Sequence, residues 1–357
     1  MIFLALIAGG YQLFAILACV FRRSQESRAG SQNVSVLKPV RGLDAGFREA
    51  IASHVALGCE VICGVASLDD PAVTVLREFP SVRIVESRTK TPNGKVGTLQ
   101  DLAAAATNPI LIVNDADIRV ERDYVRRVTA PLEDPHVGLV TCLYRPRGET
   151  FAARFEGLGV STDFAPSTLV ARMVGVDEFA MGSTMAFRRS DLERIGGFAA
   201  IADYIADDYQ LGHRIHALGL KCVLSDVIVE THLGGNWIDV WRHQVRWART
   251  IRVSKFWGYL GLPITFATAW AVVLFLTGNI ALAAAVLAAR IAMSIVAGWF
   301  VIQSRDVLSM FWVIPLRDLF GVAVWFAGLF GRTVIWRGQR LVLDPQGRIS
   351  RERGPGS

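Results

Sequence analysis

The sequence predicts an α/β domain with a mostly parallel sheet, flanked by membrane helices on both sides. Short apolar runs alternate with helical stretches between residues 33 and 236, which is typical of a parallel sheet covered by helices. Residues 2–21 and 259–331 are almost continuously apolar and help to raise the hydrophobic content of the 357-residue chain to 52%. Asp115 and Asp117 directly follow the most apolar of the strands, where open α/β sheets bind ligands.

Arginines flank the hydrophobic segments, and this charge pattern predicts an orientation. No Lys or Arg precedes residues 2–21 and arginines follow them, so we expect a retained N-terminal anchor rather than a cleaved signal peptide. The net charge is +6, and much of the excess of basic residues lies beside the hydrophobic segments: Arg22, Arg23, Arg28, Arg332, Arg337, Arg340, Arg348, Arg351 and Arg353. Such clusters mark a cytoplasmic membrane face more often than a nucleic-acid site, so no nucleic-acid partner is expected.

The five cysteines show no metal-ligand or disulfide pattern, which fits a reducing cytoplasm.

The elements of the soluble domain follow from local patterns of apolar and turn residues. We expect strands over residues 34–40, 60–67, 82–86, 110–113, 137–143 and 181–187. We expect helices over residues 46–57, 71–78, 99–106, 121–130, 190–195 and 205–218, and another that begins near Phe151. Residues 90–98 are expected to form a flexible loop that leads into the alanine-rich helix.

Several polar residues follow strands or open helices, and each has a structural and a functional interpretation. Asp115 and Asp117 either bind Mg²⁺ or Mn²⁺ together with a substrate diphosphate, or cap the next helix. Asp69 and Asp70 either cap a helix or reach the same ligand cleft. Lys95 either meets a phosphate at a helix start or is simply solvated.

Two later segments carry the remaining candidates. One helix begins with Asp207 and Asp208, which either interact with the helix dipole or include a general base. The segment 237–252 is dense in Trp and Arg, and its apolar positions predict a helix that lies against the membrane. Arg246 and Trp247 could clamp a diphosphate and stack on a substrate, although a purely structural interfacial belt would use the same residue types.

The C-terminal apolar region predicts two membrane crossings followed by a third apolar segment. Residues 260–304 contain one charge, Arg290, and are long enough for two crossings that turn at Gly278 and Asn279. Arg290 would lie inside the second crossing, where an ionisable residue suggests a function, although the sequence names no partner for it. After the apolar segment 307–331 begins, a full crossing by residues 319–335 would put the arginine-rich end outside, whereas a re-entrant or interfacial segment would keep it inside, as the positive-inside tendency favours.

In this order, the motifs resemble the ceramide glucosyltransferase family and its bacterial relatives that glycosylate hopanoids, within the inverting family 2 group of GT-A glycosyltransferases. The resemblance covers nearly the whole chain and rests on Val36–Asp44, Asp69–Ala72, Lys95–Val96, Asp115–Val120, Ala206–Tyr209, His243–Trp247, Pro315–Asp318 and Trp336–Gly338. It implies an N-terminal anchor (1–22), a cytoplasmic GT-A domain (33–236), an amphipathic interfacial helix (237–258), membrane helices (259–335) and a basic tail (336–357).

The resemblance also implies roles for individual residues. The nucleotide sugar would be bound by Lys38, Pro39, Asp69, Asp70, Lys95 and Asp115, with Asp69 or Asp70 at the uracil or ribose. Asp115 and Asp117 would hold Mg²⁺ or Mn²⁺ on the diphosphate. Asp208 would be the catalytic base, and the catalytic site would be completed by His243, Gln244, Arg246 and Trp247.

Two positions depart from the family pattern. The last motif begins with His243 where the family usually has Gln or Arg, so a positive charge there would depend on pH or come from Arg242. Ser67 stands where an aspartate often follows the second strand, which leaves the nucleoside contact open.

The expected reaction transfers glucose from UDP-glucose to ceramide with inversion, giving glucosylceramide and UDP. Transfer of N-acetylglucosamine from UDP-N-acetylglucosamine to a hopanoid, bacteriohopanetetrol, is an alternative, and a catalytically inactive nucleotide-binding membrane scaffold is an alternative from another class. A polysaccharide synthase would need more membrane crossings, and a transporter would leave the α/β domain unexplained. We expect an integral protein of a bacterial inner membrane, with the catalytic domain in the cytoplasm and the lipid acceptor in the bilayer.

Overall fold

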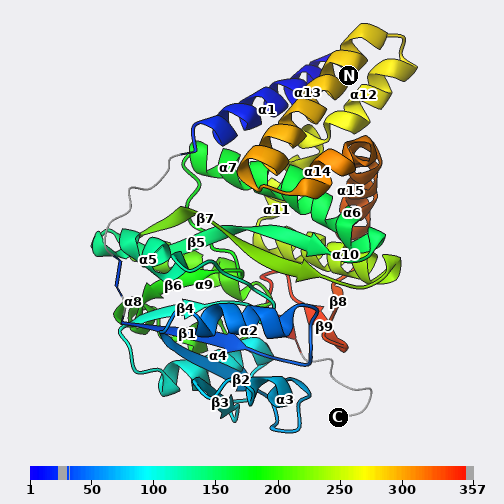
Figure 1. The fold of residues 1–357 in the computed structure, drawn as a ribbon. Helices are drawn as coiled ribbons and strands as arrows, with labels where there is room; N and C mark the ends of the chain where they lie inside the picture. Colours follow the sequence, from blue (N-terminus) through cyan, green and yellow to red (C-terminus); the bar gives the residue numbers. More distant parts are fainter. Residues whose placement is uncertain (23–29, 32, 351–357) are drawn as a thin grey trace. The chain divides into compact units, whose positions relative to one another are not determined.

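A computed structural model describes residues 1–22, 30–31 and 33–350, which fall into two compact units. The helical unit contains residues 1–22, 145–175 and 233–347 (Figure 1). The sheet unit contains the described residues of 30–144, 176–232 and 348–350. Four arginines of the predicted basic clusters lie outside the described residues: Arg23, Arg28, Arg351 and Arg353.

The sheet unit is built on seven strands in the order β3-β2-β1-β4-β6-β5-β7. Strands β3, β2, β1 and β4 are parallel, whereas β6 runs antiparallel to both β4 and β5. The mostly parallel sheet therefore agrees with the sequence prediction. The strands are β1 (Val34–Pro39), β2 (Glu60–Val65), β3 (Val82–Glu86), β4 (Ile110–Val113), β5 (Val137–Gly148), β6 (Met185–Arg188) and β7 (Lys221–Leu233).

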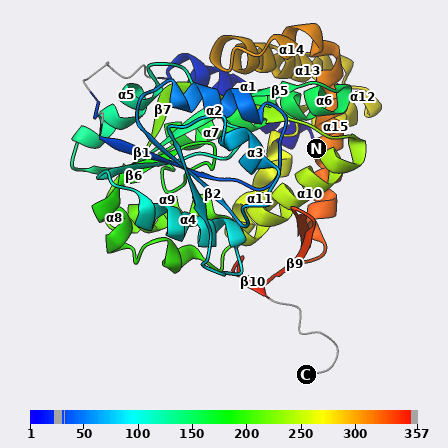
Figure 2. The ribbon, with the colours of Figure 1, turned by 60° about the horizontal axis from the view of Figure 1, so that its bottom comes forward.

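Helices cover both faces of this sheet, each over its own apolar core. In β1, Val36 belongs to one core cluster and the next residue, Leu37, to the other, because side chains alternate along a strand. Helix α2 contributes Ile51 to the first core and α4 contributes Leu99 to the second (Figure 2). The helices are α2 (Phe47–Val55), α3 (Ala72–Leu76), α4 (Gly94–Ala105), α5 (Tyr124–Thr129), α8 (Arg189–Arg194) and α9 (Asp207–Ala217).

Several elements differ from the prediction: β5 extends to Gly148, β7 was not predicted, and one changed boundary concerns a candidate residue. Helix α4 begins at Gly94 rather than at residue 99, because the Asn93 side chain accepts hydrogen bonds from the backbone N–H groups of Lys95 and Val96. Lys95 thus lies in the first turn of α4 instead of in a loop. The strand predicted over 181–187 begins only at Met185.

The helical unit contains three helices that are long and apolar enough to cross a membrane: Ile2–Val20, Ile280–Val301 and Phe311–Leu329. The helices Phe256–Thr265 and Ala267–Leu276, bent by 50° at their junction, would form a fourth. The elements are α1 (Ile2–Val20), α6 (Phe151–Gly159), π-helix η2 (Val160–Phe164), α7 (Ala165–Met173), α10 (Trp237–Ser254), α11 (Phe256–Gly261), α12 (Ala267–Leu276), α13 (Ile280–Ile295), π-helix η5 (Val296–Val301), α14 (Arg305–Ser309) and α15 (Ile314–Leu329).

A β-hairpin follows α15, in a region predicted as the end of the membrane helices and the start of a basic tail. Strand β8 (Thr333–Trp336) pairs antiparallel with β9 (Gln339–Leu343). Arg337 and Gly338 join them with φ angles of 48° and 77°, as a two-residue turn between twisted strands requires. The prediction of membrane helices up to residue 335 is therefore wrong at residues 333–335, which belong to β8.

Arg290, for which the sequence names no partner, forms a buried ion pair. Its Nε and Nη2 donate to the two carboxylate oxygens of Asp318 over 2.8 and 2.6 Å. Its Nη1 donates to the Thr162 carbonyl and to the Ser294 hydroxyl, while the Thr268 hydroxyl donates to Asp318. The Arg290 and Asp318 side chains are only 3% and 8% exposed, so this polar cluster fastens α13 to η2, α12 and α15.

Replacing Asp318 with alanine should lower the free energy of unfolding by about 3–5 kcal/mol, because it leaves the Arg290 guanidinium buried without its carboxylate. Thermal and denaturant unfolding of the detergent-solubilised protein would measure the loss. Asp306→Ala is the matched control, since the Arg154–Asp306 pair is 35% and 26% exposed and should contribute about 1 kcal/mol or less. Equal losses in the two variants would show that burial of the first pair has no special effect.

Candidate active site

The turn that follows β4 carries Asp115 and Asp117 and is held from beneath by Lys38. The Lys38 side chain is fully buried, and its Nζ donates to the carbonyls of Asp115 and Ile118 over 2.9 and 3.3 Å. Burial lowers the pKa of Lys38 to about 8, while nearby aspartates oppose that shift. Because its ammonium already donates hydrogen bonds to two backbone carbonyls, Lys38 positions the turn. Its contact with a nucleotide stays a prediction. Pro39 ends β1 beside it.

A buried polar network joins this turn to the segment before β6. The Asn114 amide donates to the Ser183 carbonyl over 2.7 Å and to the Tyr124 hydroxyl over 2.9 Å. The His54 Nε2 atom lies 3.2 Å from Oδ1 of the Asn114 side chain. Burial lowers the pKa of His54 to about 3. The network therefore fixes Gly182 and Ser183 next to Asp115, a role that the sequence motifs did not reveal.

Four residues from distant parts of the sequence converge around Gly182. Lys95 Nζ lies 2.8 Å from an Asp115 oxygen and 3.1 Å from an Asp207 oxygen, and the Gly182 N–H donates to Asp208 over 3.0 Å. A Cβ added to Gly182 would lie 3.1 Å from Asp115, 3.4 Å from the Lys95 ammonium and 3.6 Å from Asp208. A side chain there would fill the space that these three charged groups share.

The charges of this cluster shift the ionisation of its members. Burial and the charge of Asp207 raise the pKa of Asp208 to about 6, although Lys95 opposes the shift. Burial would lower the pKa of Lys95, but Asp115 and Asp207 outweigh it and raise that pKa. The ammonium of Lys95 is thus held charged, while Asp208 is a carboxyl group poised near neutral pH, as a general base requires.

Asp117 is the more enclosed of the two aspartates of the turn. Its carboxylate accepts hydrogen bonds from the Thr231 hydroxyl and from the backbone N–H of His232, both at the end of β7. Burial and the charge of Asp115 raise the pKa of Asp117. Among the described residues, the buried His232 Nδ1 has no hydrogen-bond partner.

The carboxylates of Asp115 and Asp117 have the chemistry of ligands that share a metal ion with substrate phosphates. Within the described residues, no three His, Cys, Asp or Glu side chains are grouped as ligands for an ion. Mg²⁺ and Mn²⁺ are often held by one or two carboxylates, with substrate phosphates and water as the other ligands. The two hard carboxylate groups match that arrangement, and the space beside Gly182 borders Asp115.

The pair Asp69–Asp70 separates into two roles. The Asp70 carboxylate accepts from the backbone N–H groups of Gly42 and Ala72 at 2.9 Å, so it holds the loop after β1 and caps α3. Asp69 is exposed, and its carboxylate accepts a hydrogen bond from the hydroxyl of the nearby Ser67. Of the two, Asp69 has the carboxylate that remains accessible to a nucleoside.

In the helical unit, the His243–Trp247 motif lies on α10 and is tied to Glu156 of α6. Glu156 Oε1 is 2.6 Å from His243 Nδ1 and 2.7 Å from Gln244 Nε2. The Gln244 carbonyl oxygen accepts from Arg317 over 2.9 Å, and the Trp247 ring meets the His243 ring edge to face at 4.7 Å. Gln244 is therefore a buried structural residue, and its partner Glu156 is a site residue that the sequence analysis missed.

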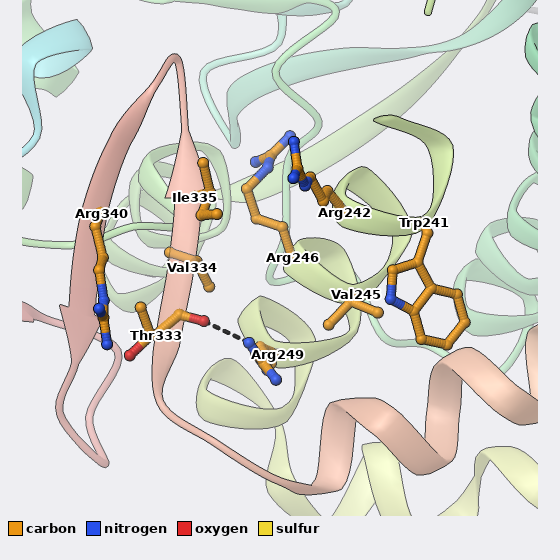
Figure 3. A pocket seen from close by; sticks show the side chains of 9 residues that line it. All are labelled: Trp241, Arg242, Val245, Arg246, Arg249, Thr333, Val334, Ile335 and Arg340. Atoms are coloured by element: carbon orange, nitrogen blue, oxygen red, sulfur yellow. Dashed lines mark hydrogen bonds between the residues drawn. The ribbon is translucent and has the colours of Figure 1, made fainter. Parts of the chain in front are cut away.

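Arg246 faces a cavity of about 360 Å³ between α10 and the β8–β9 hairpin (Figure 3). One wall is formed by Trp241, Arg242, Val245, Arg246 and Arg249 of α10, and the other by Thr333, Val334, Ile335 and Arg340. The structure thus gathers Lys95, Asp115, Asp117 and Asp208 within the sheet unit and His243, Gln244, Arg246 and Trp247 within the helical unit.

Comparisons with known proteins identify the family of the chain and proteins that are similar to it. The family model described as glycosyl transferase family 21 matches residues 1–349. Ceramide glucosyltransferase 1 of Caenorhabditis elegans is 25% identical over 204 residues, 54% of this chain and 44% of the relative. Beta-monoglucosyldiacylglycerol synthase of Synechocystis is 27% identical over 177 residues, 48% of this chain and 36% of the relative. The matches thus span less than half the length of these relatives.

Among solved structures, the mannosyltransferase PcManGT of Pyrobaculum calidifontis, in complex with GDP-Man and Mn²⁺, resembles the chain with a TM-score of 0.53. It is 21% identical, and the match covers 91% of this chain and 97% of that one. At this identity the likeness concerns the fold, and it confirms the predicted GT-A fold.

Proposed function

Because the chain belongs to glycosyl transferase family 21, we propose that it is a membrane-bound inverting enzyme that moves a hexose from a UDP-sugar to a lipid hydroxyl. The observation that carries the proposal is the convergence of Asp115, Lys95 and Asp208 around Gly182. It combines groups suited to a diphosphate with a carboxyl group suited to accept a proton.

The chemistry needs a base for the acceptor and charge neutralisation for the leaving group. As the lipid hydroxyl oxygen attacks the anomeric carbon, its proton passes to Asp208 and the bond from that carbon to UDP breaks. One such displacement inverts the anomeric centre and gives a β-glycoside from an α-linked donor. When bound at Asp115 and Asp117, Mg²⁺ or Mn²⁺ would neutralise charge on the diphosphate. The manganese and nucleotide sugar bound by PcManGT support this assignment.

Other residues are proposed to bind and position the substrates. Lys95 supplies a fixed positive charge for the diphosphate, and Asp69 is the accessible carboxylate for the ribose or uracil. Arg246 would stabilise the leaving diphosphate, and Trp247 would stack on the acceptor or its sugar. His243 and Gln244 support this motif through Glu156 rather than by direct contact with substrate.

We propose UDP-glucose as donor and ceramide as acceptor, because two of the relatives bear names of enzymes that glucosylate lipids. The apolar helices support a location in the membrane, and the arginines beside them support a bacterial inner membrane protein with its sheet unit in the cytoplasm. The second relative adds diacylglycerol as an acceptor to be compared with ceramide and with a hopanoid.

The test is transfer from radiolabelled UDP-glucose and UDP-N-acetylglucosamine to ceramide, diacylglycerol and bacteriohopanetetrol, with and without Mn²⁺. Mass spectrometry would identify each labelled lipid. We expect glucosylceramide in the presence of Mn²⁺ and little product without it. A labelled hopanoid or diacylglycerol alone would reassign the acceptor. Tight UDP binding with no product from any pair would identify a nucleotide-binding scaffold instead.

A further inference from the structure

The last described residues of the chain, Arg348–Ser350, belong to the sheet unit, although the residues directly before them belong to the helical unit. Ile349 is only 7% exposed, and its backbone N–H donates to the Asp203 carbonyl over 2.6 Å. Beside this bond, Arg348 and Tyr204 form an antiparallel bridge. We call these three residues the clasp, because they lie along the part of the chain that leads into α9.

The side chain of Tyr204 contacts both the clasp and α9. Arg348 Nε donates to the Tyr204 hydroxyl over 3.3 Å, and its guanidinium lies 5.4 Å from the centre of the tyrosine ring. The guanidinium of Arg214, in the last turn of α9, lies 5.9 Å from the centre of the same ring. Cations within about 6 Å of an aromatic ring are attracted to it. The ring therefore connects the clasp to the helix that begins with the acidic pair.

The loop 202–206, which carries these clasp contacts, is also bonded to the start of α4. The backbone N–H of Asn93 donates to the Ala202 carbonyl over 2.9 Å, and its side-chain amide donates to the Tyr204 carbonyl over 2.8 Å. Asn93 is also the N-cap of α4, whose first turn carries Lys95. The loop therefore connects the start of α4 to the start of α9.

The loop leads directly to the acidic pair of the candidate active site. An Asp207 oxygen lies 3.1 Å from Lys95 Nζ, and Asp208 accepts the Gly182 N–H over 3.0 Å. Tyr204 and Asp208 are four positions apart, so a displaced loop would move both carboxylates. A misplacement of about 1 Å can lower an enzymatic rate by about a hundredfold.

We infer that the clasp is a positioning segment, in which Arg348 and Ile349 hold the loop 202–206 and thereby set the place of Asp208 beside Gly182. The loop lies at the surface: the Asp203 side chain is exposed, and it is the backbone carbonyl that accepts from the clasp. Surface segments open locally more easily than core elements, so a few contacts decide their order. The inference rests on the proposed function only for the role of Asp208 as the base.

The first measurement is amide hydrogen exchange of the full-length protein in detergent without substrate, in peptides that cover residues 203–210. Arg348→Ala changes an exposed side chain and removes its contacts with Tyr204. Ile349→Pro removes the N–H that donates to Asp203. We expect exchange to become about three- to tenfold faster in each variant, because one hydrogen bond shifts a local equilibrium by roughly that factor.

Two conservative variants and one distant variant are the controls. Ile349→Val keeps the backbone N–H, and Arg348→Lys keeps a cation that can lie on the tyrosine ring, so both should exchange nearly like wild type. Lys221→Ala removes an exposed charge at the start of β7, about 33 Å along that strand from Thr231. Thermal unfolding would show that the Arg348 variants are as folded as wild type.

The second measurement is steady-state transfer by the same variants. We expect kcat to fall about three- to tenfold in Arg348→Ala and further in Ile349→Pro, with KM for UDP-glucose changed less than about twofold, because Lys95 and Asp115 keep their contact. The loss of kcat/KM with falling pH should also move to lower pH. A looser loop admits water to Asp208 and reduces the burial that raises its pKa. Unfolded protein would instead lower the rate equally at every pH.

Faster exchange together with a lower kcat and a shifted pH profile would support the inference. Exchange at the wild-type rate in both Arg348→Ala and Ile349→Pro would overturn it, and so would faster exchange with unchanged kcat and unchanged pH profile. If wild-type protein transfers no sugar to any acceptor, the proposed reaction is rejected, while hydrogen exchange still decides whether the clasp orders the loop.

Discussion

Asp208→Asn should abolish most sugar transfer while leaving UDP binding intact. A positioned general base contributes about 10²–10⁴-fold to a rate, and asparagine cannot accept the proton of the acceptor hydroxyl. The Asp208 carboxylate accepts from the N–H groups of Gly182 and Tyr209 over 3.0 and 2.7 Å, so its orientation is fixed before substrate binds. Steady-state transfer rates and UDP titrations would separate chemistry from binding.

The pH dependence of wild-type transfer gives a second measurement of the same group. Asp208 must be ionised to act as a base, and its raised pKa of about 6 places the loss of kcat/KM with falling pH well above the range of an ordinary aspartate. Exposed Asp203 is the matched control, since Asp203→Asn should change neither the rate nor the profile. Transfer by Asp208→Asn at the wild-type rate would reject Asp208 as the base.

Asp117→Ala should lower transfer at least about a hundredfold and remove the effect of Mn²⁺ on UDP affinity. Residues that only hold a metal ligand in place commonly contribute ten- to hundredfold, so a ligand itself should contribute more. Calorimetric titration of UDP with Mn²⁺ and with EDTA would measure the metal-dependent part of binding, and transfer assays would follow the rate.

Thr231→Val provides a graded comparison at the same site. The Thr231 hydroxyl donates to the Asp117 carboxylate, so its removal should weaken metal-dependent binding by about ten- to hundredfold without abolishing it. If wild-type protein binds UDP equally well with Mn²⁺ and with EDTA, the metal site at Asp115 and Asp117 is wrong. In that case Lys95 would remain as the source of positive charge for the diphosphate.

Much of the fold could be predicted from local sequence because its strands are short, apolar and separated by helical stretches. The run Ile110–Val113 predicts a buried strand, and β4 occupies those residues in the middle of the sheet. Boundaries set by a single side chain were harder to predict, such as the start of α4 at its Asn93 cap. The β8–β9 hairpin was missed because its strands are short and its surroundings are rich in arginine.

The candidate residues could be named from motifs, but their contacts depend on the tertiary structure. Asp115, Lys95 and Asp208 each follow from a local pattern, whereas their meeting at Gly182 requires the end of β4 and the starts of α4 and α9 to lie at one place. The Glu156–His243 hydrogen bond joins residues 87 positions apart, and no local pattern marks Glu156. Lys38 was predicted to bind the nucleotide because it lies in a recognised motif, but its side chain is buried and holds the turn that carries Asp115.

Contacts within the helical unit also limit how often the chain can change sides of a membrane. Thr150 donates to the Gly235 carbonyl over 3.0 Å, so the starts of α6 and α10 lie at one level. Arg145 donates to the Ile302 carbonyl over 2.9 Å, which brings the end of η5 back to that level. Arg249 of α10 donates to the carbonyl of Phe330, so the residues directly after α15 lie beside α10 as well.

A chain that leaves and rejoins the same side crosses an even number of times. Residues 255–301 hold two candidate spans, the bent pair and α13, so both cross or neither does. Residues 303–329 hold only one candidate span, Phe311–Leu329. A single crossing would separate the two ends of this segment by about 30 Å of hydrocarbon. We therefore expect α15 to stay on the side of α10 despite its apolar composition, and Arg340 to lie on that side, as the positive-inside tendency favours.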